Sequence, residues 1–88
     1  MSILDDNNTT IYHKILVFFD NNINEVRDFV EIATKYKDLE IRSGRWIIDA
    51  QSFLGILSLD LSEPVALIYP EDMKTAIERD FVRWIYDE

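Results

Sequence analysis

The sequence predicts an α+β domain in which a four-stranded antiparallel sheet carries three helices on one face. Segments with strand-like and helix-like apolar spacing follow one another in the order βαββαβα. The chain has 88 residues, the size of one compact domain, and 48% of them are hydrophobic. With only two glycines and two prolines, this composition excludes disorder. The expected architecture is an open-faced sandwich whose second sheet face is uncovered.

The N-terminal residues predict a leader followed by a strand. Residues Met1–Thr10 are mostly small and polar, without a periodic apolar pattern, so we expect a flexible leader before a domain that occupies residues 11–88. Residues 12–19 are rich in β-branched and aromatic types and end at the polar run 20–22. This pattern is typical of a strand followed by a turn.

A helix is predicted from Ile23 onward, where the apolar spacing changes to the helical period. Its apolar face lies at i, i+3, i+4, i+7 and i+10 and consists of Val26, Phe29, Val30, Ala33 and Tyr36. Asn22 stands where an N-cap is expected, and Glu25 is three residues later. We therefore expect Asn22 to cap the helix with Glu25 as its reciprocal partner.

The remaining elements follow from turn residues and periodicity. Residues 39–42 and 45–48 flank Ser43-Gly44 and predict a hairpin with a two-residue turn, in which Gly44 supplies the positive φ. We expect a short helix over 51–57 and a last strand over 64–69. A terminal amphipathic helix is predicted over 71–86, with its apolar side formed by Met73, Ala76, Ile77, Phe81, Trp84 and Ile85.

The net charge and the counts of cysteine and histidine argue against several classes of binding and catalytic function. Seventeen acidic against nine basic residues give a net charge of −8, and the basic residues never form a run. Nucleic acids and membranes are therefore not expected partners, because binding them depends on a positive patch. There is no cysteine and one histidine, so we expect no metal, no cofactor and no nucleophile–histidine catalysis. The chain is expected to be a cytoplasmic protein and not an enzyme.

Three stretches resemble the histidine-containing phosphocarrier (HPr) family of the sugar phosphotransferase system in residue type and spacing. They are Ala33-Thr34-Lys35-Tyr36, Ser43-Gly44-Arg45 and the stretch from Asp49 to Leu59, of which Ser52–Leu59 is the most specific. The predicted element order agrees with that of the family. The resemblance implies the same open-faced sandwich.

The residues that carry a phosphoryl group in that family are missing here. The family uses a histidine in a Gly-x-His-x-Arg-Pro loop at the start of the first helix, where the helix N-terminus and the arginine hold the anion. The matching loop here contains Asn21, Asn22 and Asn24, with neither Gly-x-His nor Arg-Pro. We therefore interpret it as a degenerate phosphohistidine loop. The nearest basic residue, Arg27, is expected to pair with Glu31 one turn later.

The two other candidate phosphoryl acceptors, His13 and Asp20, lack the sequence context that such a role needs. His13 lies between Tyr12 and Lys14 in the first predicted strand, which indicates a strand-edge residue. Asp20 follows an apolar strand like the acceptor aspartate of response-regulator receivers. It lacks their acidic pair and distal lysine, so a loop-capping role is expected.

The short predicted helix carries the candidate functional residues. Ser52 matches the serine that a regulatory kinase phosphorylates in bacterial members of the family, although serine at a helix start is also a common N-cap. Phe53, Leu54 and Leu57 match an apolar patch that docks on enzyme I, on that kinase and on a transcription factor. A helix this short cannot bury five apolar residues between Phe53 and Leu59, so one side should be exposed.

The sequence thus predicts a non-catalytic HPr-like regulatory or protein-interaction domain without histidine phosphocarrier activity. By resemblance, its expected partner is enzyme I, the regulatory kinase or the transcription factor; self-association with a second copy of the chain is the other expectation. Two alternatives stay open: a phosphotransferase component that acts through an unrecognised site, and a general interaction domain unrelated to sugar transport.

Overall fold

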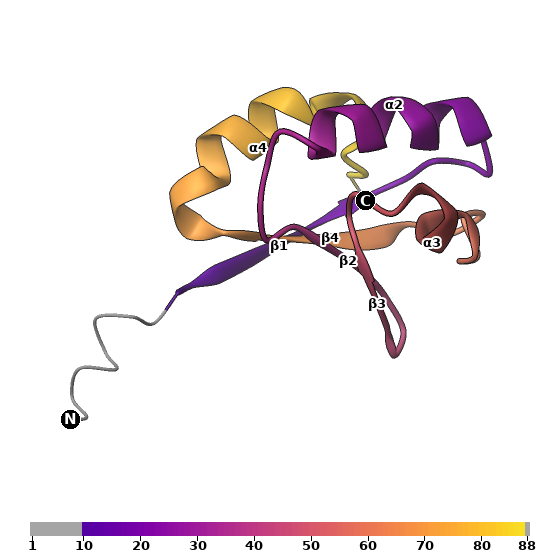
Figure 1. Cartoon of the computed structure of the whole chain (residues 1–88), viewed down its shortest axis with the longest axis horizontal. Coiled ribbons are helices and arrows are strands. Elements are labelled where there is room, and N and C mark those ends of the chain that lie inside the picture. The colour runs from indigo at the N-terminus through magenta and orange to yellow at the C-terminus, as the bar shows by residue number, and fades with distance from the viewer. Residues whose placement is uncertain (1–9, 88) are drawn as a thin grey trace.

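The chain folds into the predicted α+β open-faced sandwich, with helices on one face of a four-stranded antiparallel sheet (Figure 1). The computed structural model describes residues 10–87, so the predicted leader lies outside the described residues except for Thr10. The strands are β1 (Tyr12–Val17), β2 (Glu40–Ser43), β3 (Trp46–Asp49) and β4 (Val65–Pro70), paired in the order β1-β4-β2-β3. The helices are α2 (Ile23–Ala33), α3 (Phe53–Leu57) and α4 (Lys74–Asp80), with 3-10 turns η1 (Glu71–Met73) and η2 (Val82–Trp84) around α4.

The alternation along the strands separates a covered face from an open face. In β4, Val65, Leu67 and Tyr69 are buried beneath the helices, whereas Ala66 and Ile68 between them are only half-buried. This is the period of two that directs successive side chains to opposite faces. β1 ends two residues earlier than predicted, at Val17, since its partner β4 begins directly opposite, at Val65.

α2 begins as predicted at an Asn22 cap, but Glu25 does not complete the capping box. The Asn22 side-chain oxygen accepts from the backbone N–H of Asn24 and of Glu25, at 2.9 and 3.4 Å. The Glu25 carboxylate instead accepts from the indole N–H of Trp84 at 2.8 Å and from Arg83 at 2.9 Å. The prediction of a reciprocal cap was wrong because a residue 59 positions away competes for that carboxylate.

The β2–β3 hairpin has its predicted tight turn one residue later than expected. Ser43 pairs with Trp46, so the two turn residues are Gly44 and Arg45. Gly44 has a φ of +59°, as predicted, and Arg45 does not have a positive φ. A positive φ at the first turn position alone is the pattern of a type II′ turn, whose twist matches that of the strands.

The C-terminal segment is not the single helix that the apolar spacing predicts. It divides into η1, α4 and η2, and Phe81 leaves helical geometry with φ −109° and ψ 11°. The chain then runs along the outer edge of β1: Phe18 N–H donates to the Trp84 carbonyl at 2.9 Å and Tyr86 N–H to the Leu16 carbonyl at 2.8 Å. Unpaired groups on the β1 edge thus compete with the helix for the backbone of residues 84–86.

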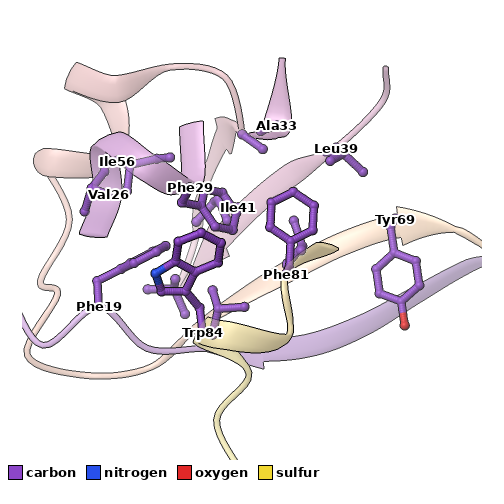
Figure 2. Packing of buried hydrophobic residues seen from close by; sticks show 14 of the residues in the cluster. Phe19, Val26, Phe29, Ala33, Leu39, Ile41, Ile56, Tyr69, Phe81 and Trp84 are labelled. Atoms are coloured by element: carbon purple, nitrogen blue, oxygen red, sulfur yellow. The ribbon is translucent and has the colours of Figure 1, made fainter. Parts of the chain in front are cut away.

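An aromatic cluster joins α2, the C-terminal segment and the sheet. Figure 2 shows the rings of Phe19, Phe29, Phe81 and Trp84 gathered together, with Tyr69 farther along the sheet. The Phe29 ring lies 4.7 Å from that of Phe81 and 5.4 Å from that of Trp84, measured between centroids. All four residues are buried, so the cluster forms the centre of the core.

We predict that the Glu25 contact makes stability depend on acid pH. Hydrogen bonds from Arg83 and then from Trp84 lower the pKa of Glu25 below its ordinary value of 4.5. The stabilisation is therefore present above about pH 4.5 and is lost as pH falls through the lowered pKa. In urea titrations from pH 7 to pH 3, Glu25→Gln should lose less unfolding free energy on acidification than the wild type.

A double-variant comparison isolates this contact. In an Arg83→Met background, the Glu25→Gln change should alter the pH dependence less than it does alone, because the main cause of the lowered pKa is gone. Equal pH slopes for the wild type and Glu25→Gln would contradict the prediction.

Candidate functional site

The two segments singled out by the sequence, the loop before α2 and the helix α3, lie next to each other. α2 packs against α3, and the Arg27 guanidinium carbon lies 5.9 Å from the ring centroid of Phe53. Arg27 donates to the side-chain oxygen of Asn24 at 2.8 Å rather than pairing with Glu31 as predicted. The structure therefore places the first turns of α2 next to α3.

Ser52 caps α3, as its position at the helix start predicts. Its Oγ accepts from the backbone N–H of Gly55 at 3.1 Å, and its own backbone is extended, with φ −91° and ψ 95°. The Ser52 side chain is half-buried. The capping role therefore already occupies the oxygen that a kinase would modify.

Gly55 permits close contact between α3 and the β2–β3 hairpin. A Cβ at this position would lie 2.7 Å from Cγ2 of Ile48 and 2.7 Å from Oγ of Ser52. Both distances are well below van der Waals contact, so the glycine is required by packing at this point. This approach fixes how far α3 stands above β3.

The three candidate docking residues differ in exposure. Leu54 is 77% exposed, whereas Phe53 and Leu57 are half-buried and pack against the core. Ile56 is fully buried, so the five-residue helix turns one side inward and Leu54 outward. The α2 side of this region adds Ile23, which is exposed and one helical turn from Arg27.

We call this region the α3 surface, and it consists of Ile23, Arg27, Phe53, Leu54 and Leu57. Ile23 was not predicted as part of this surface because it borders the apolar face of α2, in the first helical turn. The signal that could have found Ile23 is the one used for α3, namely an apolar side chain at a helix position that the core does not cover.

At the start of α2, the N–H groups of Asn24 and Glu25 are already paired. Asp20 and Asn21 adopt positive φ values of 52° and 56°, and both are exposed. The Asn22 oxygen already accepts from two N–H groups of the first helical turn, the groups that would otherwise face an anion. Asn24 holds Arg27.

His13 lies at the other end of β1 from this loop. Four strand positions separate it from Val17, a distance of roughly 13 Å. Its Nε2 is 3.1 Å from the Glu71 carboxylate, and its ring stacks on Tyr69 with centroids 5.7 Å apart. These contacts agree with the strand-edge interpretation and separate the histidine from the α3 surface.

Within residues 10–87, no cluster of three or more histidine, cysteine or acidic side chains is placed to hold a metal ion. In the same part of the chain, no helix has the length and apolar character needed to cross a bilayer.

No protein-family model matches the sequence, and no curated protein or solved structure is significantly similar to it. The relationship to the HPr family therefore stays a prediction that rests on the quoted residues.

We predict that Ser52 contributes to stability as a cap. Ser52→Ala should lower the free energy of unfolding by about 0.5–2 kcal/mol, because the Gly55 N–H loses its acceptor. Ser52→Asp should be nearly neutral, since a carboxylate also caps and interacts favourably with the helix N-terminus. Urea unfolding followed by circular dichroism measures both, and equal losses in the two variants would contradict the cap.

Gly55→Ala should destabilise the domain despite the higher helix propensity of alanine. The added Cβ would press on Ile48, so we expect a loss of about 1–3 kcal/mol in unfolding free energy. Thr75→Ala, at an exposed position of α4, is the matched control and should be nearly neutral. If Gly55→Ala is as stable as the wild type, the close approach of α3 to β3 is not tight in solution.

Proposed function

We propose that this chain is a non-catalytic, cytoplasmic protein-interaction domain, a regulatory relative of the HPr phosphocarriers, that binds a protein partner through the α3 surface. It carries no phosphoryl group on histidine. The observation that carries the proposal is the 77% exposure of Leu54, next in the chain to Phe53, whose ring contacts Arg27.

The shape and composition of the α3 surface fit a docking site. Leu54 provides a protruding apolar anchor, and the half-buried Phe53 and Leu57 provide a firm base beneath it because they pack against the core. The Arg27 guanidinium near the Phe53 ring adds a charged group whose one hydrogen bond within residues 10–87 is to the neutral amide of Asn24. Interface centres commonly combine apolar anchors with arginine.

The charge of the chain favours a partner with basic residues around an apolar cleft. A net charge of −8 attracts a basic surface at long range and accelerates encounter with it. Exposed Asp49 and Asp60 flank α3 in the sequence and supply acidic groups near its two ends. The apolar anchor then supplies affinity, while the charges supply orientation.

The loop before α2 supports the absence of phosphocarrier activity in the proposal. Histidine is absent from the loop, and the Asn22 side chain occupies N–H groups that would stabilise an anion there. His13 is held against Glu71 and Tyr69 at the opposite end of β1. By resemblance, the partner is enzyme I, the regulatory kinase or the transcription factor of the phosphotransferase system.

Phosphorylation of Ser52 would change this surface directly. A phosphate there adds up to two negative charges at the start of α3, adjacent to Phe53 and Leu54. It would also replace the hydroxyl in the Gly55 cap. The modification would therefore select among partners by charge while α3 stays capped.

The test uses purified enzyme I from the organism that encodes this chain. Titration of this protein, labelled with ¹⁵N, should shift the amide signals of α3 and of the first turn of α2. Leu54→Asp should weaken binding by about 2 kcal/mol or more without loss of stability, because the exposed anchor is replaced by a charge. Val82→Asp is the matched control: Val82 is also exposed, at 64%, and lies in η2.

The same mixture tests the phosphoryl step. With phosphoenolpyruvate added, no acid-labile label should appear on this chain, and label that disappears in His13→Ala would overturn the non-catalytic proposal. If neither enzyme I, the kinase nor the transcription factor shifts the α3 signals, the link to sugar transport fails. If Leu54→Asp and Val82→Asp weaken binding equally, the α3 surface is not the docking site.

A further inference from the structure

β3 is an unpaired edge of the sheet. Within residues 10–87, β3 has β2 on one side and no strand on the other. Figure 1 shows the β2–β3 hairpin projecting from the sheet on the side away from the helix layer. Trp46 and Ile47 on this strand are 58% and 59% exposed. Two large apolar side chains on a free strand edge are the conditions for pairing with another chain.

The hydrogen-bond pattern of the hairpin shows which backbone groups of β3 face outward. Ala50 N–H donates to the Leu39 carbonyl at 3.0 Å, so Ala50 faces β2. Backbone direction alternates along an antiparallel strand, and therefore Ile48 and Trp46 also face β2. The N–H and C=O of Ile47 consequently point away from the sheet, toward the free edge.

The residues around Ile47 are self-complementary about that position. The segment reads Arg45-Trp46-Ile47-Ile48-Asp49, with a cation at one end and an anion at the other. If a second copy pairs antiparallel with Ile47 opposite Ile47, then Arg45 lies opposite Asp49 at both ends. Trp46 then lies opposite Ile48. The two side chains of each such pair lie on the same face of the sheet, where they can contact each other.

We propose that two copies of this chain associate through their β3 edges, antiparallel and with Ile47 on the two-fold axis, into a continuous eight-stranded sheet. The outward N–H and C=O groups of the two Ile47 residues form the central hydrogen-bonded pair. A contact of this kind is isologous, so it closes at two copies and does not propagate. The interface is small, and the dimer is accordingly weak.

Charge identifies a second copy as the occupant of the edge. Among the described residues, Arg45 contacts the Trp46 ring, 5.7 Å from its centroid, and makes no ion pair. Asp49 accepts the Gln51 N–H with Oδ1, and its exposed carboxylate likewise makes no ion pair there. In the proposed register each group meets its opposite charge. A second copy of the chain therefore forms two ion pairs, one at each end of the paired strands.

Charge exchange between the two ends tests the register. Sedimentation equilibrium from about 10 μM to about 1 mM should show the wild type passing from monomer to dimer. Arg45→Asp and Asp49→Arg should each reduce self-association by about tenfold or more, because each places like charges opposite one another at both ends. Mixing the two single variants should restore association as a heterodimer, since every end pair is then of opposite charge.

Three controls make the result decisive. Lys37→Asp changes the net charge as Arg45→Asp does, at an exposed position outside the hairpin strands, and should leave association unchanged. Leu54→Asp should also leave it unchanged, which separates this edge from the α3 surface. Circular dichroism should show all variants folded. A wild type that is monomeric at about 1 mM, or a mixture of the two variants that does not associate, overturns the proposal.

Discussion

The contact of Phe29 with Phe81 and Trp84 is the interaction on which the rest of the structure depends. Phe29 comes from α2, and the other two residues come from the C-terminal segment, so their packing holds both segments on the same face of the sheet. The Trp84 indole adds a directional bond to Glu25 at the start of α2. Burial of the large aromatic rings stabilises the packing, and the hydrogen bond from Trp84 to Glu25 fixes how the C-terminal segment is placed along α2.

This arrangement determines which surfaces are left for partners. Because α2 and the C-terminal segment occupy the centre of the covered face, the short α3 stands at its margin beside the hairpin. There it turns Leu54 to solvent and approaches Ile48 through Gly55. The side of α3 that faces β3 is therefore separate from the side that carries Leu54.

The loop before α2 shows how one side chain can change the chemistry of a helix start. A helix N-terminus presents unpaired N–H groups that attract anions. In this chain Asn22 fills two of them from within, and Asn24 binds the nearby Arg27. Groups of a kind that attract anions are thus used to stabilise α2, and Arg27 is held beside Phe53.

The sequence by itself determined the elements that depend on neighbouring residues. The apolar face of α2, the Asn22 and Ser52 caps and the positive φ of Gly44 are local effects, and the structure confirms them. The exposure of one side of α3 also followed from a local count, since a short helix has only one inner side, and the structure places Leu54 on the exposed side.

Only the tertiary structure decided the features that depend on distant competitors. Glu25 left the capping box for Trp84, Arg27 turned to Asn24 rather than Glu31, and the predicted terminal helix broke at Phe81. In the last case, backbone groups on the outer edge of β1 hydrogen-bond to residues 84–86. The helical period of the sequence carries no information about these β1 groups. Local spacing predicts which groups need a partner, whereas the fold decides which of the available partners is near enough to bind.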